Sequence, residues 1–408
     1  MLVAFDDTDS VSGGCTTHMV FRVLLALPEL ALRSMPRLVR LNPNVPWKTR
    51  GNGAVVLSLC KPTGPQVRVG ELLGREILAF PDGEPVEPSE EVLERVWATV
   101  SKHASEDADP GVALFAEPPS PLLYWAAVRE TVPAPGTNAA FSRGGRGRIG
   151  ATAAAAWPGP ASSYEFIAYR DESAWGTTRE VNPTPLMNLD SYGLFHTYDS
   201  EENVACCIPN TPCPVLLGLR GRDPDTLQRL AGQTLPLAVE ETIAGWLLFA
   251  TNQASGDHVT EVPTLLEADP GMTLRLQATV TDTPEWKEGG HVHVALEDEF
   301  GIGFTAVAFE PTKGFRHHLA NVRAGDRLEL TGAWDKTLRL ESFAIRAATR
   351  NGPVPQHCGK SMKSKGTGNQ YRCHCGATAE RETVAGPTGA FEVPVIARRH
   401  LHKPLAWK

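Results

Sequence analysis

Three aspartates stand within four residues of one another near the start of the sequence, in the segment DDTDSVSGGCTT. Asp7 and Asp9 share one side of an extended backbone, because side chains alternate along a strand. Carboxylates this close repel one another unless protons or a cation neutralise them. Mg²⁺ takes oxygen ligands and accompanies nucleotide phosphates, so it is the cation that we expect here. The sequence therefore predicts a magnesium site formed by Asp6, Asp7 and Asp9.

A glycine-rich turn and the start of a helix follow these aspartates. Gly13 and Gly14 let the backbone bend and let a ligand approach closely, and the helix expected over residues 17–27 offers free N–H groups and a positive dipole end. This combination is typical of a phosphate site, although the lysine-bearing P-loop motif is absent and positive charge must come from PWKTRGNG. The predicted ATP- and phosphate-binding residues are Ser10, Gly13, Gly14, Cys15, Thr17, Lys48 and Arg50. The alternative is an acidic turn whose Thr16 or Thr17 caps the helix and that binds nothing.

Strands and helices alternate through the part of the chain that precedes residue 260, which favours an α/β or α+β arrangement. LVAF is expected to be a strand that leads into the aspartates, and residues 38–59 are expected to form a strand, a long loop and a second strand. Residues 136–150 are rich in glycine and arginine, and we expect them to form a flexible loop. The other expected elements are two helices within residues 70–107, helices over 149–157 and 238–253, and a strand over 162–170.

The pattern changes near residue 270 to short segments in which apolar and polar residues alternate. Five such segments follow one another, beginning with TLRLQATVT and separated by glycine-containing turns. This arrangement predicts a small closed barrel, for which the OB-fold is the natural candidate. The commonest ligands of that fold are single-stranded nucleic acids and oligosaccharides.

Charge is distributed unevenly along the chain, whose net charge is −8. Residues 351–408 contain nine Lys and Arg against three Asp and Glu, so this tail is basic and the rest of the chain is strongly acidic. An acidic body with a basic tail is typical of contact with a phosphate polymer, although a merely solvated tail is the simpler alternative. No apolar stretch is long enough to span a membrane and no signal peptide is evident, so we expect a cytoplasmic protein without a membrane partner.

Nine segments together resemble the archaeal tRNA 2-agmatinylcytidine (agmatidine) synthetase family over nearly the whole chain and in the family's order. They are DDTDSVSGGCTT, VRLNPNVPWKTRGNGAVVL, RIGATAAAAWP, YEFIAYR, WGTTREV, CPVLLGLRG, FATNQ, GGHVHVALEDEFG and ARRHLHKPL. The resemblance implies a multidomain α+β protein with four parts. These are a kinase-like ATP-binding catalytic domain over 1–128, a ferredoxin-like domain over 129–262, an OB-fold over 263–350 and a basic zinc-ribbon-like module over 351–408.

The resemblance also implies a reaction. The enzyme would be an ATP-dependent ligase that attaches agmatine to carbon 2 of the wobble cytidine of the isoleucine tRNA with a CAU anticodon. The product is 2-agmatinylcytidine, which changes decoding from AUG to AUA. In the family ATP ends as AMP and phosphates, and a threonine that corresponds to Thr16 becomes phosphorylated. Thr16, Asp7 and Lys48 are therefore the expected catalytic residues, with ATP and Mg²⁺ as cofactors.

Two further sets of residues follow from the chemistry of agmatine and tRNA. A guanidinium is bound in a fork by carboxylates, and the candidates are Glu165, Asp190 and Asp199, although solvated acids without a ligand are the simpler alternative. Cationic side chains in basic or glycine-rich segments are candidates for contact with phosphates. The predicted tRNA-binding residues are Arg143, Arg146, Arg148, Lys360, Lys363, Lys365 and Arg372.

The ribbon departs from the family's pattern of two C-x-x-C pairs. Pro355 stands where the first cysteine is expected, and the second pair is shortened to CHC. The remaining candidate Zn²⁺ ligands are Cys358, Cys373 and Cys375. His357 or His374 would be the fourth ligand, but each adjoins a cysteine ligand, which strains tetrahedral geometry. A metal-free ribbon is the alternative.

Two other functions stay open at this stage. The first is a non-catalytic RNA-binding protein built from the OB-fold and the ribbon, which would have no need of the aspartate, glycine and threonine cluster. The second is a divergent paralogue that keeps the phosphate chemistry but modifies another RNA or attaches another amine. The altered ribbon is the feature that keeps the second alternative open.

Overall fold

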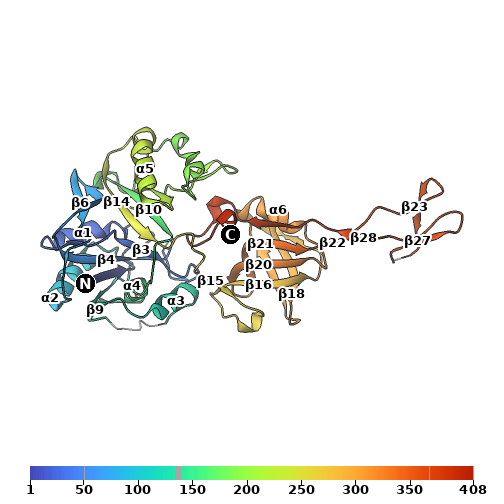
Figure 1. The fold of residues 1–408 in the computed structure, drawn as a ribbon, viewed down its shortest axis with the longest axis horizontal. Helices are drawn as coiled ribbons and strands as arrows, with labels where there is room; N and C mark the ends of the chain where they lie inside the picture. Colours follow the sequence, from blue (N-terminus) through green and yellow to red (C-terminus); the bar gives the residue numbers. More distant parts are fainter. Residues whose placement is uncertain (50, 134–138, 367, 408) are drawn as a thin grey trace. The chain divides into compact units, whose positions relative to one another are not determined.

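The structure of the protein, a computed structural model, describes residues 1–49, 51–133, 139–366 and 368–407. It divides into two compact units (Figure 1). The first contains Met1–Thr260, Gly271–Thr273 and Pro394–Lys408, and the second contains Glu261–Pro270 and Leu274–Val393. The segment that begins at Pro394 therefore belongs to the first unit and not to the ribbon that precedes it. Within the described residues, no helix has the length and apolar character needed to cross a membrane.

A mixed sheet forms the centre of the first unit. Through the described residues its strands run in the order β13-β10-β14-β5-β6-β2-β4-β1-β8-β9, with β3 paired to β14 and β4, and β7 paired to β4. The pairing is parallel between β3 and β14 and between β2 and β6. The strands are β1 (Leu2–Asp6), β2 (Ala31–Leu32), β3 (Arg37–Arg40), β4 (Gly53–Lys61), β5 (Val67–Leu72), β6 (Arg75–Ala79), β7 (Glu84–Pro85), β8 (Gly111–Phe115), β9 (Phe141–Gly144), β10 (Ser163–Arg170), β13 (Val215–Gly221) and β14 (Ile243–Thr251).

Strand β1 is the predicted LVAF strand, and it is buried on both faces between β4 and β8. Val3 and Phe5 belong to the core that contains buried residues of α1 and α2. Leu2 and Ala4 point the other way, into the core that contains residues of α3 and α4. The helices are α1 (Met19–Ala26), α2 (Glu90–His103), α3 (Pro121–Arg129) and α4 (Gly147–Ala155). Helices therefore cover both faces of this strand, whose carboxyl end carries the aspartates.

The helix expected over residues 238–253 is wrong, because most of this segment forms strand β14. The strand lies between β10 and β5 in the sheet, and successive side chains enter different cores, with Leu247 and Phe249 in one and Leu248 in the other. A short apolar run that is buried on both faces cannot be told from a buried helix by periodicity. The helix of this region is α5 (Pro224–Ala238), which the sequence analysis missed and which Asp223 caps by accepting a hydrogen bond from Thr226 N.

Two other expectations are corrected. The first helical pattern within residues 70–107 is part of the β5–β6 hairpin, whose turn residues Leu73 and Gly74 have φ angles of +49° and +77°. Such a two-residue turn matches the twist of paired strands. The second pattern is confirmed as α2, which is capped by Ser89. The expected loop over 136–150 contains β9 and the beginning of α4, while residues 134–138 lie outside the described chain.

The second unit contains a closed barrel. Strands β16, β20, β21, β19 and β18 pair in that order, and a pairing of β16 with β18 closes the ring. These are the five strands that the alternating segments predict. The strands of this sheet are β15 (Val259–Glu261), β16 (Thr273–Val280), β17 (Glu285–Lys287), β18 (His291–Asp298), β19 (Gly303–Ala308), β20 (Arg327–Trp334), β21 (Leu338–Ala347) and β29 (Gly389–Glu392). A short helix, α6 (Phe315–Ala320), contacts β18, β19 and β29.

The ribbon consists of short antiparallel pairings. Strand β22 pairs with β28, β23 pairs with β24, and β25, β26 and β27 form a three-stranded sheet. The strands are β22 (Thr349–Asn351), β23 (Gln356–His357), β24 (Lys360–Ser361), β25 (Lys363–Ser364), β26 (Gln370–Arg372), β27 (Thr378–Glu380) and β28 (Thr383–Ala385). Most of their side chains are exposed, so little apolar burial stabilises this segment.

Candidate active site

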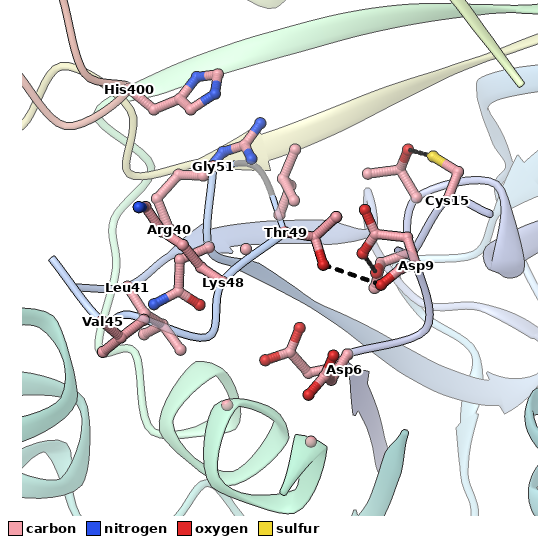
Figure 2. A pocket seen from close by; sticks show the side chains of 18 of the residues that line it. Asp6, Asp9, Cys15, Arg40, Leu41, Val45, Lys48, Thr49, Gly51 and His400 are labelled. Carbon is pink, nitrogen blue, oxygen red and sulfur yellow. Dashed lines mark hydrogen bonds between the residues drawn. The ribbon is translucent and has the colours of Figure 1, made fainter. Parts of the chain in front are cut away.

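A cavity of about 350 Å³ lies in the first unit, at the carboxyl end of β1. The loop between β3 and β4, the start of α4 and the C-terminal segment also contribute to its wall. Figure 2 shows Asp9 and Cys15 on one side of this space and Arg40 and His400 on the other. The polar and charged side chains that line it include Asp6, Asp7, Asp9, Thr16, Thr17, Arg40, Lys48, Thr49, Glu130, Arg146, Glu165, Arg220 and His400.

Asp6 ends β1 and lies against the first turns of α4. A Cβ atom on Gly150 would come 1.8 Å from Asp6 Oδ2, and one on Gly147 would come 2.4 Å from the Asp6 carbonyl oxygen. A side chain at position 147 would collide with backbone, and one at position 150 would displace the carboxyl group of Asp6. Burial, together with the negative charges of Asp7 and Asp9, raises the pKa of Asp6 to about 7. A bound cation would reverse this shift by favouring the carboxylate.

Asp7 binds an arginine that comes from the turn before α4. Its backbone adopts a left-handed conformation, with φ at +55°. The Nη2 and Nε atoms of Arg146 donate to Asp7 Oδ2 over 2.7 and 3.1 Å, and Arg146 N donates to Asp109 Oδ2 over 2.9 Å. The guanidinium carbon also lies 5.8 Å from the ring centroid of Trp47. Arg146 is thus fixed inside the cavity, and the expectation that a flexible loop carries it is wrong.

The two neighbouring arginines of this segment make other contacts. Arg143, on β9, forms an ion pair with Glu94 of α2. Arg148 Nε donates to the carbonyl oxygen of Gly145 over 3.3 Å. Neither arginine lines the cavity. The structure therefore separates three arginines that the sequence analysis grouped together.

Thr16 lies beside a carboxylate of the acidic segment. Its Oγ1 accepts a hydrogen bond from Thr8 Oγ1 over 3.0 Å and donates one to Asp9 Oδ1 over 3.3 Å. Helix α1 begins after His18, which makes no side-chain capping hydrogen bond. The alternative in which Thr16 caps the helix is therefore wrong. A hydroxyl that donates to a carboxylate has the geometry that a nucleophile and its base would require.

The glycine turn shapes the loop rather than the cavity wall. Ser10 N donates to Gly13 O over 2.9 Å, and Ser105 Oγ donates to the same oxygen over 2.8 Å. Gly14 has a φ of +76°, and a Cβ there would come 2.5 Å from Ser105 Oγ. Of the predicted phosphate-binding residues, Cys15, Thr17 and Lys48 line the cavity, whereas Ser10, Gly13 and Gly14 do not. Arg50 lies outside the described residues.

The three aspartates line one cavity without meeting at one point. Within residues 1–49, 51–133, 139–366 and 368–407, three or more His, Cys, Asp or Glu ligand atoms gather within 4.8 Å of one another only in the ribbon. Mg²⁺ usually needs only one or two protein carboxylates, because phosphate oxygens and water complete its shell. Asp7 is engaged by Arg146 and Asp9 by Thr16, so Asp6 is the member of the three that could still serve as such a ligand.

Glu165, on β10, is the centre of a buried charged network. Only 2% of it is exposed, and it accepts hydrogen bonds from Arg220 Nε over 2.9 Å, Arg40 Nη2 over 3.4 Å and Gln253 Nε2 over 2.5 Å. Although burial opposes ionisation, Arg220 and Arg40 hold the pKa of Glu165 below its ordinary value. This carboxylate is therefore ionised and already neutralised by protein cations.

The other two acids proposed for agmatine do not line the cavity. Asp199 accepts hydrogen bonds from the backbone N–H groups of Glu201, Glu202 and Ile396, each within 3.1 Å. Burial raises the pKa of Asp190, which accepts a weak hydrogen bond from the backbone of the segment that leads into β11 (Tyr198–Asp199). Both carboxylates therefore stabilise loops of the first unit by accepting backbone hydrogen bonds.

His400 is a cavity residue that the sequence analysis missed. Its Nδ1 lies 2.9 Å from Gln253 Oε1, which joins it to Glu165. A Cβ atom on Gly51 would come 2.5 Å from His400 Nε2, so this glycine lets the imidazole approach the β3–β4 loop. The one available signal was the segment ARRHLHKPL, which carried the family resemblance but no assigned role. No periodicity reveals that a tail returns to the first unit.

Four cysteines also line the cavity, at positions 15, 206, 207 and 213. Burial raises the pKa of Cys206 to about 11 and that of Cys207 to about 12. These two thiols therefore stay protonated near neutral pH. Since the thiolate is the reactive form of cysteine, neither of the two is prepared to act as a nucleophile.

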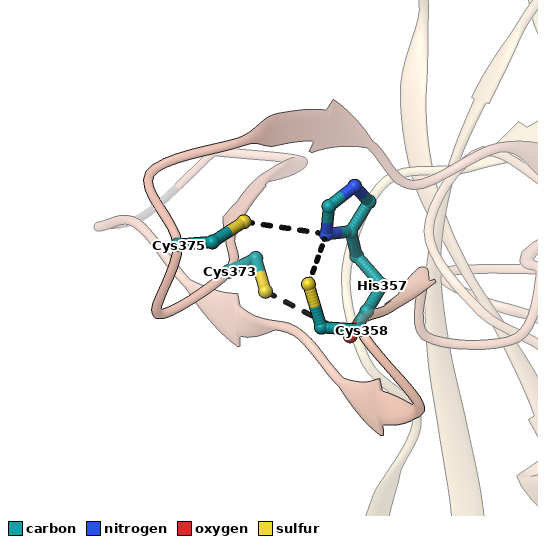
Figure 3. Close-up of side chains that lie close together, drawn as sticks. All are labelled: His357, Cys358, Cys373 and Cys375. Carbon is teal, nitrogen blue, oxygen red and sulfur yellow. Dashed lines mark hydrogen bonds between the residues drawn. The ribbon is translucent and has the colours of Figure 1, made fainter.

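The ribbon gathers four metal-ligand side chains (Figure 3). Ligand atoms of His357, Cys358, Cys373 and Cys375 all lie within 4.8 Å of one another. His357 Nδ1 is 3.1 Å from Cys358 Sγ and 3.4 Å from Cys375 Sγ. Cys358 has a φ of +51°, and this left-handed turn lets two adjacent residues face one centre. His374 is not part of the group, so the structure favours His357 as the fourth member.

Two surfaces of the second unit are candidates for contact with nucleic acid. The predicted tRNA-binding residues Lys360, Lys363, Lys365 and Arg372 are all exposed on the ribbon. On the barrel, Trp286 of β17 is 49% exposed, with Arg316 5.8 Å and His317 5.2 Å from its ring. An exposed aromatic ring beside an arginine is a pattern on which nucleic-acid bases stack.

The chain matches two family models. The model of the TiaS TCKD domain matches residues 2–152, and the model of the TiaS FLD domain matches residues 145–258. Together they cover the part of the first unit that contains all the cavity residues except His400.

Relatives and solved structures match over the full length. The tRNA 2-agmatinylcytidine synthetase TiaS of Methanosarcina mazei, which acts on an isoleucine tRNA, is 32% identical, with 99% of this chain and 97% of the relative covered. A crystal structure of TiaS in complex with that isoleucine tRNA and ATP matches with a TM-score of 0.78 at 30% identity, covering 99% of this chain and 96% of that one. A complex of TiaS with the same tRNA, AMPCPP and agmatine matches with a TM-score of 0.72 at 28% identity and the same coverage.

Proposed function

The chain belongs to the tRNA 2-agmatinylcytidine synthetase family, and from this membership we propose that it is an ATP-dependent ligase that attaches agmatine to tRNA. The acceptor is carbon 2 of the wobble cytidine in the isoleucine tRNA with a CAU anticodon, and the product is 2-agmatinylcytidine. Similar proteins have been crystallised in complex with an isoleucine tRNA and ATP, and with the same tRNA, AMPCPP and agmatine. These complexes support the same three substrates for this chain.

One observation carries this proposal. The Thr16–Asp9 hydrogen bond lies in the same cavity as Arg146 and Lys48. A hydroxyl, a proton acceptor and two cations are the groups that phosphoryl transfer to a side chain requires. A protein that only bound RNA would have no use for this arrangement, so the non-catalytic alternative is not favoured.

We propose that Asp9 takes the proton of Thr16 when this hydroxyl attacks a phosphate of ATP. The new bond joins Thr16 Oγ1 to phosphorus, the bond from phosphorus to the bridging oxygen breaks, and the remaining nucleotide leaves with the electron pair. Arg146 and Lys48 offset the negative charge of the transferred group. Asp7 holds Arg146 in place through its two hydrogen bonds.

Mg²⁺ is the metal that we propose for the acidic end of the cavity, where it would neutralise phosphate charge. Asp6 is the carboxyl that we propose as its ligand, because Asp7 is engaged by Arg146 and Asp9 accepts a hydrogen bond from Thr16. Burial raises the pKa of Asp6, so a cation bound beside it would favour its ionised form.

Zn²⁺ is the metal that we propose for the ribbon. Three thiols and one imidazole nitrogen are a ligand set typical of structural zinc sites, and the four side chains are already gathered. His357 would replace the cysteine that Pro355 displaces. The exposed lysines and arginine of this segment would then face the phosphates of tRNA.

The domain assignment also remains a proposal. We assign the kinase-like fold to residues 1–128, the ferredoxin-like fold to 129–262 and the OB-fold to 263–350. The five-stranded closed ring supports the last of these. Because Glu165 is neutralised by two arginines, we propose that it positions other residues of the cavity rather than binding the guanidinium of agmatine.

Labelled agmatine tests the proposed function directly. Wild-type protein, ATP and Mg²⁺ should transfer the label to a tRNA with a CAU anticodon and not to the same tRNA with a UAU anticodon. Thr16→Ala and Asp9→Asn should each lower the rate by about 100-fold or more, the usual contribution of a nucleophile or its base. Thr16→Ser keeps the hydroxyl and is the matched control, which should retain measurable activity. Equal rates in wild type and Thr16→Ala would remove Thr16 from the reaction.

A further inference from the structure

The tautomer of His400 is determined by its hydrogen-bonded neighbours. Glu165 is ionised, so it can only accept hydrogen bonds, and Gln253 must turn its Nε2 amide group toward it. The other end of the same amide, Gln253 Oε1, then faces His400 Nδ1 over 2.9 Å. Because a carbonyl oxygen only accepts, Nδ1 must carry the proton. His400 Nε2 therefore presents its lone pair.

This lone pair belongs to a ring that lines the cavity beside Gly51. Figure 2 shows the imidazole on the opposite side of the space from Asp9 and Cys15. The acidic end is suited to the nucleotide phosphates, so His400 lies on the side that is left for the other substrates. No role described above for the acidic end uses this nitrogen.

The surroundings keep His400 neutral. Arg40 of β3, Arg220 of β13 and the neighbouring His196 face it, and Glu165 of β10 reaches it only through Gln253. Burial, with the charges of Arg40, Arg220 and His196, holds the pKa of His400 well below its ordinary value. Nε2 therefore keeps its lone pair throughout the neutral range, although the same arginines lower the basicity of this nitrogen.

We infer that His400 Nε2 is the base that accepts a proton from the primary amine of agmatine when this amine attacks the activated cytidine. This inference rests on the proposed function and assigns the base of its second step. The ammonium of agmatine first releases one proton to water. As nitrogen bonds to carbon 2, a second proton passes to Nε2, the bond from carbon 2 to oxygen breaks, and phosphate leaves with the electron pair.

His400→Asn is the variant that tests this inference most sharply. The asparagine amide can still donate to Gln253, which keeps the network intact, but no basic nitrogen replaces Nε2. We expect agmatine transfer to fall by about 100-fold or more, in keeping with the loss of a general base. Consumption of ATP in the presence of tRNA should stay within about threefold of wild type, because the phosphoryl-transfer residues lie elsewhere in the cavity. Lys403→Ala, an exposed position in the same segment, is the control and should match wild type in both assays.

An agmatine analogue separates a chemical role from a structural one. In 1-aminooxy-3-guanidinopropane the attacking nitrogen is far less basic, so the adduct loses its proton to water more readily and depends less on a protein base. The ratio of wild-type to His400→Asn kcat/KM should therefore shrink by at least about tenfold with this analogue, and added imidazole should restore part of the agmatine rate.

Three results would overturn the inference. They are an unchanged agmatine rate in His400→Asn, equal losses with both amines, or a parallel loss of ATP consumption. Failure of the wild-type protein to transfer agmatine would instead reject the proposed function itself, so the two failures are distinguishable.

Discussion

Arg146 and Asp7 are separated by 139 positions in the sequence, yet Arg146 Nη2 donates to Asp7 Oδ2 over 2.7 Å. This pair joins the acidic segment after β1 to the start of α4. The strand and the helix pack closely because glycines at 147 and 150 leave room for Asp6. The contact places a guanidinium in the cavity beside Trp47.

Arg146→Ala should therefore weaken the use of ATP more than the binding of tRNA. We expect the KM for ATP to rise by about 10- to 150-fold, the range for losing one charge-assisted phosphate contact of about 1.5–3 kcal/mol. Steady-state kinetics with tRNA and agmatine in excess would measure it. Arg95→Gln removes a half-buried arginine that pairs with Glu29 away from the cavity, and it should leave this KM unchanged. A rise confined to the Kd for tRNA would contradict the assignment.

The stability of the first unit should fall in acid because of His18. Three aromatic rings surround this imidazole, with the centroids of Phe21, Tyr169 and Trp175 at 5.5, 5.3 and 5.3 Å. Burial, followed by the charge of Arg22, lowers its pKa to about 4. Between pH 6.5 and 4, His18 is protonated in the unfolded chain but not in the folded chain. The free energy of unfolding therefore decreases as the pH falls through this window.

Urea unfolding of wild type and His18→Gln at about pH 7.5 and about pH 5 would measure this effect. The wild type should lose about 2 kcal/mol more than the variant over this interval, since one pKa unit corresponds to about 1.4 kcal/mol. The comparison cancels the contributions of the other buried histidines, which both proteins share. Parallel pH profiles would show that His18 is not the responsible group.

The ribbon should bind one zinc ion per chain through His357 and not through His374. Metal analysis of protein purified without chelator should give one equivalent of zinc for wild type and for His374→Ala. His357→Ala and Cys373→Ser should each lower the zinc content severely, because a four-ligand structural site loses its closed shell when one ligand is removed. Equal zinc contents in the two histidine variants would refute the choice of ligand.

Trp286 should contribute to the affinity for tRNA. Trp286→Ala is expected to raise the Kd by about 5- to 150-fold, because stacking of a base on an aromatic ring contributes about 1–3 kcal/mol. Phe300 is also exposed, but it lies beside acidic residues at the turn between β18 and β19. Phe300→Ala therefore serves as the control in filter-binding titrations at fixed salt. A similar small change in both variants would exclude the barrel face around Trp286.

The sequence predicted the elements whose patterns are local. The alternating strands of the barrel, β1 and α4 follow from periodicity and from glycines at turns. Strand β14 was mistaken for a helix because its apolar run enters two different cores. Its character depends on neighbours that are distant in the sequence, and no local pattern contains them.

The residues of the candidate site also fall into a group that is local in the sequence and a group that only the fold brings together. Asp6, Asp7, Asp9 and Thr16 were found because they are close together in the sequence. The partners Arg146, Glu165 and His400 come from three other parts of the chain, and only the fold brings them together. Arg146 was assigned to tRNA because its segment was expected to be a flexible loop. The role of His400 depends on a C-terminal segment that leaves the second unit and returns to the first.

The central claim is that this chain replaces the 2-oxo group of the wobble cytidine with agmatine. Mass spectrometry of nucleosides from the CAU-anticodon isoleucine tRNA, incubated with the protein, ATP, Mg²⁺ and agmatine, measures this most directly. We expect 2-agmatinylcytidine at the wobble position, formed only when ATP and agmatine are both present and not by Thr16→Ala. Unmodified cytidine after incubation with the complete mixture would contradict it.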